Sequence, residues 1–179
     1  MNIEKEIPLL ESILGQWKEV IGDGFEGYKN HCYRMLNFCF SLRDCSETEK
    51  KKLIISACFH DLGLWTENTL DYLPPSVLLA EQYLKENKLD DWVEEVGLII
   101  DLHHKVTAYK GSGFPLVEVF RRADLTDFSL GIIKGGVSKE CVREVRETFP
   151  NAGFHKGLVK AQMKWLVKHP LNPAPIFKW

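Results

Sequence analysis

The chain has 179 residues, of which 45% are hydrophobic, and this is enough for one globular domain with a sizeable core. Its 23 basic and 25 acidic residues are spread along the sequence and leave a formal net charge of −2. Because the chain has neither a basic stripe nor an acidic tail, we do not expect it to bind a nucleic-acid polymer.

Hydrophobic periodicity predicts an all-α bundle of about seven or eight helices and no strands. The first predicted helix runs from Ile3 to Ile21, where apolar residues recur at steps of three and four. The second runs from Phe25 to Leu42 and carries Tyr28, His31 and Arg34 on adjoining turns of one face. His31 should therefore point in the same direction as Arg34.

The third predicted helix brings polar groups into apolar surroundings. It starts at the Ser-x-x-Glu capping box of residues 46–49, and residues 53–59 are so apolar that its end should be enclosed. His60 and Asp61 lie at that end, and Gly63 is suited to leaving the helix. A buried histidine and aspartate rarely occur without a partner or a metal.

Residues 64–74 are predicted to form a loop that could lie over the site, because they have no clear period and end near two prolines. A fourth helix is expected from Ser76 to about Asn87. Three of its residues are predicted to face inward: Leu78, Leu79 and Tyr83.

Two further helices carry polar residues on apolar faces. The fifth begins at Asp90, and its buried stripe ends at His103, with His104 beside it; periodicity favours His103 as the inward histidine. The sixth runs from Pro115 to about Ser129 and places Asp124 on an otherwise apolar face. We expect Asp124 to be buried.

The remaining residues are predicted to support this core. A seventh helix capped by Ser138 runs to about Phe149, and an eighth runs from Gly153 to His169. Residues 170–179 contain three prolines and cannot be helical, but their apolar side chains suggest a tail that packs back on the body. We interpret residues 1–179 as one domain with a core at 25–129, supporting helices at 130–169 and this tail.

The cysteines and the first residues favour a cytoplasmic location. The five cysteines are an odd set with no Cys-x-x-Cys spacing, which is typical of a reducing compartment. The opening residues are charged and lack the apolar block of a signal peptide, and no apolar run approaches the ~20 residues of a membrane span. We expect no interaction with a membrane, and a monomer or a homodimer.

Four residues from three predicted buried helices form a candidate metal site: His31, His60, Asp61 and Asp124. Two imidazoles and two carboxylates suit one divalent ion such as Mn²⁺, Fe²⁺, Co²⁺, Ni²⁺ or Zn²⁺. Their order and context are similar to the H…HD…D ligand set of the HD-domain superfamily, over residues 25–129. Three segments carry the resemblance: residues 28–34 (YKNHCYR), 58–63 (CFHDLG) and 121–124 (RRAD).

The resemblance implies that these four residues are metal ligands in a helical bundle, and that the reaction is hydrolysis of a phosphate ester of a small molecule such as a nucleotide. Asp61 would hold the ion and orient the attacking water. His103 and His104 are candidates for a ligand, a catalytic base or a hydrogen bond behind the ligands.

Four further residues are candidates for substrate binding: Arg34, Lys105, Arg121 and Asp127. Arg34 and Lys105 would hold phosphate. Arg34 and Arg121 have an alternative role as ion-pair partners of Asp61 or Asp124, and Asp127 has one as a cap of its helix.

Two other functions stay open. An iron-dependent oxygenase would use a similar set of ligands with further histidines, and a non-catalytic module would bind a metal or nucleotide and pass that state to a partner. Because His103 and His104 are adjacent in this chain, whereas the oxygenase branch has two separated histidines, we favour hydrolysis with one metal ion.

Overall fold

The structure is a computed structural model that describes residues 3–178, and these residues form the predicted all-α fold. A single isolated bridge, between Lys105 and Lys178, is the only extended pairing among them. The helices are α1 (Pro8–Gly15), α2 (Lys18–Ile21), α3 (Phe25–Leu42), α4 (Glu47–Phe59), α5 (Gly63–Thr66), α6 (Leu73–Glu86), α7 (Val93–Leu102), α8 (Pro115–Phe128), α9 (Lys139–Thr148) and α10 (Phe154–Lys168), with 3₁₀ turns η1 (Gly22–Gly24) and η2 (Asp90–Trp92).

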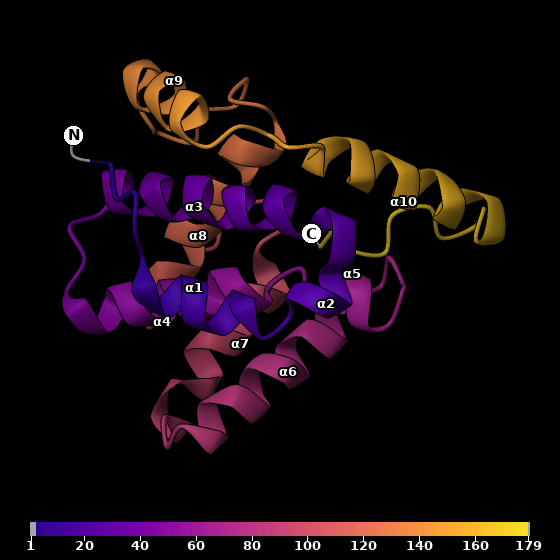
Figure 1. Cartoon of the computed structure of the whole chain (residues 1–179). Coiled ribbons are helices and arrows are strands. Elements are labelled where there is room, and N and C mark those ends of the chain that lie inside the picture. Colours follow the sequence, from indigo (N-terminus) through magenta and orange to yellow (C-terminus); the bar gives the residue numbers. More distant parts are fainter. Residues whose placement is uncertain (1–2, 179) are drawn as a thin grey trace.

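Helix α4 lies at the centre of the bundle. It contacts α1, α3, α6, α7 and α8, while α3 packs mainly on α8 and α6 mainly on α7 (Figure 1). Every residue from Leu53 to Phe59 is buried. Since α4 is covered on all sides, the two polar residues that follow it, His60 and Asp61, are buried as well, as their apolar context indicated.

Local signals set several helix boundaries. The side chain of Ser46 accepts a hydrogen bond from the Glu49 amide, and the Glu49 carboxylate accepts one from the Ser46 amide, which confirms the capping box. At the start of α9, the Ser138 side chain accepts a hydrogen bond from the Cys141 amide, without a reciprocal bond. Helix α3 spans the predicted residues Phe25–Leu42.

The first predicted helix, Ile3 to Ile21, is wrong in its extent. The chain is extended at Ile7, and Pro8 stands in the first turn of α1, where its missing amide hydrogen is tolerated. A turn after Gly15 then separates α1 from the short α2. The periodic apolar residues still face the core, since Leu10 and Leu14 are buried.

The predicted loop at residues 64–74 and the start of the following helix also need correction. The segment contains α5, and α6 begins at Leu73 because Pro74 and Pro75 fit its first turn. Leu78 is 64% exposed rather than inward-facing. The buried stripe of α6 instead passes through Ser76, Ala80 and Leu84, which are four residues apart.

The C-terminal tail lies on the body of the protein. Ile176 packs in a small cluster with Tyr72 and Leu73, and the Val106 amide donates a hydrogen bond to the carbonyl oxygen of Lys178. All five cysteines are buried, and none of them forms a disulfide bond. Within residues 3–178, none of the helices has both the length and the apolar content that crossing a membrane requires.

Gly63 and Gly157 offer a matched test of packing. A Cβ on Gly63 would lie 2.5 Å from the carbonyl oxygen of Tyr72 and 2.9 Å from Cγ of Pro75, whereas a Cβ on Gly157 in α10 would meet nothing within 4 Å. We expect Gly63→Ala to lower the free energy of unfolding by about 1–3 kcal/mol. Gly157→Ala should raise it by about 0.5–1 kcal/mol, because alanine favours a helix interior. Urea denaturation measures both, and equal effects would contradict the tight packing around Gly63.

Candidate metal centre

Three helices bring the predicted metal ligands together. His31 comes from the middle of α3, His60 and Asp61 from the end of α4, and Asp124 from α8. All four side chains are buried, with exposed fractions of 0–3%. His103 and His104, at the end of α7, converge on the same point.

The first group consists of His31, His60 and Asp61, whose ligand atoms all lie within 4.8 Å of one another. The Nε2 atoms of the two histidines are 3.0 Å apart, and Oδ2 of Asp61 lies 3.3 Å from His60 Nε2 and 3.9 Å from His31 Nε2. Asp124 adds Oδ1 at 3.6 Å from His31 Nε2. A metal ion could bind to this group.

The second group consists of Asp61, His103 and His104 and meets the same distance limit. Oδ1 of Asp61 lies 3.5 Å from Nε2 of His103, and Oδ2 of Asp124 lies 3.4 Å from Nδ1 of His104. Asp61 therefore belongs to both groups and turns one oxygen toward each. Both histidines of the adjacent pair face the site, and not His103 alone.

Hydrogen bonds fix the orientation of three of these imidazoles. Nδ1 of His60 lies 2.8 Å from the Ala57 carbonyl oxygen, and Nδ1 of His103 lies 2.6 Å from that of Ile100. Since a carbonyl oxygen only accepts, each Nδ1 carries a hydrogen, and the neutral form of each ring turns an unprotonated Nε2 toward the centre. Nδ1 of His31 donates in the same way to Asp127.

This arrangement leaves acceptors facing acceptors in a buried space. Asp61 Oδ1 and His103 Nε2 are two of the three buried side-chain polar atoms among residues 3–178 that have no hydrogen-bond partner. Two neutral imidazoles with unprotonated Nε2 atoms at 3.0 Å have no proton to share. A cation between these atoms would satisfy them, so the donor set fits a divalent metal.

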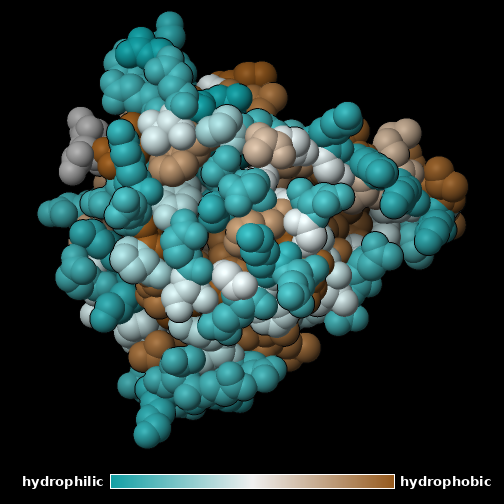
Figure 2. All heavy atoms as spheres, viewed as in Figure 1, coloured by the Kyte–Doolittle hydropathy of each residue, from teal (hydrophilic) through white to brown (hydrophobic). Residues whose placement is uncertain are grey.

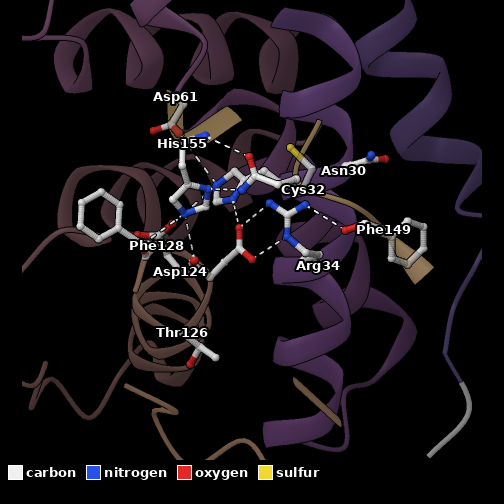
Figure 3. A network of polar contacts seen from close by, with 12 residues as sticks. Asn30, Cys32, Arg34, Asp61, Asp124, Thr126, Phe128, Phe149 and His155 are labelled. Atoms are coloured by element: carbon white, nitrogen blue, oxygen red, sulfur yellow. Dashed lines mark hydrogen bonds and ion pairs between the residues drawn. The ribbon is translucent and has the colours of Figure 1, made fainter. Parts of the chain in front are cut away.

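Asp127 holds His31 on the side of the ring that faces away from the other ligands. Its Oδ2 accepts from Nδ1 of His31 at 2.7 Å, and both its oxygens accept from Arg34, at 2.6 and 2.7 Å. Figure 3 shows Arg34 reaching from α3 into this network, with a further bond to the carbonyl oxygen of Phe149. A carboxylate behind a ligating histidine fixes the orientation and tautomer of the ring.

Burial sets the charge of the metal-free site. It lowers the pKa of His31 to about 4, against the opposing effect of Asp127, and it lowers the pKa of His104 well below its ordinary value. Burial also raises the pKa of Asp124 to about 8, with Asp61 and Asp127 as further negative neighbours. At neutral pH, both histidines are therefore neutral and Asp124 holds a proton that a metal ion would displace.

The predicted substrate-binding residues have other partners in the structure. Arg34 is 1% exposed and is held by Asp127 and by the Phe149 and Pro150 carbonyl oxygens, so its guanidinium does not face the site as a phosphate ligand. Asp127 is fully buried and does not cap its helix.

Arg121 pairs with Glu118, at 2.7 and 2.8 Å, and with neither Asp61 nor Asp124. Lys105 follows His104 and is half-buried, and its carbonyl oxygen accepts a hydrogen bond from Arg121. A phosphate contact by the Lys105 side chain stays a prediction.

Sequence reasoning missed three aromatic residues at the site. The hydroxyl of Tyr72 lies 2.8 Å from Nε2 of His104, the ring of Phe154 stacks on His31 at 4.3 Å between centroids, and the ring of Phe177 lies 5.8 Å from that of His104. Tyr72 and Phe177 lie in segments without periodicity, so no sequence signal marks them. The contact of Asp127 with His31 was also not predicted, but Asp127 does carry a sequence signal, because it follows Asp124 by three residues on one helix face.

Comparisons with protein-family models, with curated proteins and with solved structures found no match to this chain. The assignment of the site therefore depends on its own geometry: two groups of buried ligand atoms that share Asp61 and could hold metal.

The raised pKa of Asp124 predicts how pH affects the metal-free protein. The native pKa of Asp124 is about 8, above its ordinary value of 3.8. Between these two pH values the native state binds more protons than the unfolded state, so the free energy of unfolding falls as pH rises toward 8. Between pH 7 and 8 the slope should stay below the one-proton limit of about 1.4 kcal/mol per pH unit, because Asp124 itself ionises as pH approaches 8. The lowered pKa values of His31 and His104 oppose this slope near and below pH 6.5, where histidines of the unfolded state still bind protons, and their effect fades as pH rises toward 8.

Chemical denaturation in EDTA at several pH values measures this slope. Bound metal should abolish it, since the ion takes the place of the proton, and Asp124→Asn should abolish it in the metal-free protein. An equally steep fall in Asp124→Asn would assign the effect to another group.

The Asp127 network predicts a joint effect on stability and metal binding. Asp127→Asn leaves the Arg34 charge buried without its carboxylate, so we expect a loss of about 3–5 kcal/mol in unfolding free energy. Metal affinity should fall about 10- to 100-fold, because His31 loses its ionised partner. Adding Arg34→Leu should restore part of the stability but not the affinity. Denaturation and metal titration measure the two, and an unchanged affinity would contradict the anchoring role of Asp127.

Proposed function

We propose that this protein is a metal-dependent hydrolase of the HD type that acts on a phosphate ester of a small molecule. The observation that carries the proposal is the convergence of the histidine Nε2 atoms on the two oxygens of Asp61, with Asp61 Oδ1 and His103 Nε2 unpartnered. The resemblance to the H…HD…D pattern supplies the reaction class.

The geometry favours two adjacent ions over the single ion expected from the sequence. His31, His60 and Asp61 would hold one ion, and Asp61, His103 and His104 the other, with Asp124 near both groups. A divalent ion in such a site lowers the pKa of bound water toward neutrality and polarises a phosphoryl oxygen.

The chain's own residues indicate the direction from which substrate would approach. The His104 side chain is 8% exposed, more than those of His31, Asp61 and Asp124, at 2–5%. Phe128 and Phe177, which are 40% and 42% exposed, contact the His104 ring from outside. Substrate would therefore enter past these two rings, where Lys105 also lies.

Tyr72 and Asp61 have distinct roles in this proposal. The Tyr72 hydroxyl holds His104 through its Nε2, which leaves Nδ1 directed at the site. Asp61 would fix the spacing between the two groups and accept a hydrogen bond from the attacking water. These contacts hold the reacting groups in place before substrate arrives.

An iron-dependent oxygenase is the second candidate, because two neighbouring groups that share a carboxylate suit a pair of redox-active ions as well. The two activities differ in what they consume. Hydrolysis releases phosphate without oxygen, whereas an oxygenase takes up oxygen with the ferrous protein.

Elemental analysis and a phosphate-release screen test the proposal. We expect about two metal ions per chain and hydrolysis of one or more small phosphate esters when the metal is restored. Asp61→Ala should stay folded, lose both ions and lower turnover at least about 100-fold, because metal and water lose their shared ligand. Asp44→Ala, at an exposed carboxylate, is the control and should change neither property.

His103→Ala should remove one ion and keep the other. Phosphate release that survives metal loss in Asp61→Ala would contradict the proposed function. Oxygen uptake by the ferrous protein without phosphate release would favour the oxygenase.

A further inference from the structure

A groove of about 830 Å³ lies between α10 and residues 64–70, next to the metal centre but separate from it. Figure 1 shows α10 extending past the end of the bundle, with α5 nearby. No ligand atom of the metal groups lines the groove. Its volume is in the range of small-molecule sites.

The floor of the groove is aromatic and apolar. Trp65, Phe154 and Trp165 contribute rings, and Leu70 and Leu158 contribute aliphatic side chains. Gly157 lines the groove from α10, and the space beside it is open, since a Cβ there would have no neighbour within 4 Å. Such a floor favours the apolar body of a ligand.

One wall of the groove is positively charged. Lys160, Lys164 and Lys168 line it at four-residue intervals, so they form one stripe with about 6 Å between successive positions along the helix axis. Helix α10 contains no acidic residue, and Asp23 is the only carboxylate that lines the groove. Within residues 3–178, none of these three lysines has a carboxylate partner.

We propose that this groove binds a small anionic amphiphile, a free molecule with an aliphatic or aromatic body and a phosphate-like head group. The lysine stripe would bind the negative head group, and the rings of Trp65 and Trp165 would cover the apolar body. Neither an apolar compound without charge nor inorganic phosphate alone would use both surfaces. The proposal does not depend on catalysis at the metal centre.

An aromatic layer separates the groove from the metal centre. The Phe154 ring, which lines the groove, stacks on the metal-site residue His31, and the Trp65 ring lies 4.7 Å from Tyr28, which in turn lies 5.8 Å from His60. A ligand on this floor would therefore lie one side chain away from His31. The groove is a second site that shares a wall with the first.

Titration with octyl phosphate, kept below its micelle concentration, tests the proposal by calorimetry and by tryptophan fluorescence. Two of the five tryptophans line the groove, so their emission should change on binding. The double variant Lys160→Ala/Lys164→Ala should bind at least about tenfold more weakly, because it loses charge-assisted hydrogen bonds. Lys156→Ala is the matched control, since Lys156 is an exposed lysine of α10 that does not line the groove.

Gly157→Leu provides a second variant that should not disturb folding. Its side chain would enter the open groove, so octyl phosphate should bind at least about tenfold more weakly while thermal stability is kept or raised. Asp61→Ala should bind octyl phosphate with the affinity of the wild type. This last result tests the groove independently of the proposed function, because the proposed function is tested by phosphate release and not by binding of octyl phosphate.

Three further probes complete the test. Inorganic phosphate and octanol should each bind at least tenfold more weakly than octyl phosphate. Vesicles of phosphatidylcholine with 30% phosphatidylserine should not compete for the protein. Equal binding of octyl phosphate by the wild type, the double lysine variant and Gly157→Leu would overturn the proposal. Binding to the vesicles without binding to monomeric octyl phosphate would overturn it as well, in favour of a membrane-docking helix.

Discussion

The convergence of buried hydrogen-bond acceptors on Asp61 is the constraint on which the rest of the site depends. The Nε2 atoms of His60 and His103 face its two oxygens, and all three side chains are buried because α4 ends inside the bundle. In low dielectric such acceptors need either a cation or a proton. In the metal-free protein the raised pKa of Asp124 lets this carboxyl group keep a proton. A bound metal ion would supply the cation instead.

Folding and site formation are coupled through one buried ion pair. Arg34 and Asp127 are 93 residues apart in the chain, and their pairing joins α3 to α8, the two helices that supply His31 and Asp124. The same guanidinium donates hydrogen bonds to the carbonyl oxygens of Phe149 and Pro150, which directly follow α9. An arginine predicted to bind substrate therefore sets the position of the ligands instead.

The two candidate sites of this protein differ in their physical character. The candidate metal centre is closed, polar and built from fixed hydrogen bonds, whereas the groove is open, with an apolar floor and one charged wall. In Figure 2, hydrophobic residues are exposed at the end of the molecule to which α10 extends. This exposure agrees with Val167 at 82% and Leu171 at 99%, and it distinguishes α10 from the enclosed helices around α4.

The sequence by itself determined the helical fold, the span of α3, the capping box at Ser46 and the burial of His60, Asp61 and Asp124. These features follow from local periodicity and capping, which act over a few residues. Local rules were wrong where proline set a boundary, as at Pro8, or where an apolar side chain was placed on the wrong face of its helix, as for Leu78.

Only the tertiary structure decided that Asp61 is shared between two groups of ligands, that both His103 and His104 face the site, and that Asp127 binds Arg34. It also placed the lysines of α10 opposite residues 64–70. Each of these facts joins segments far apart in the chain. Such pairings depend on how helices pack in three dimensions, and the period of one helix carries no information about the distance to another.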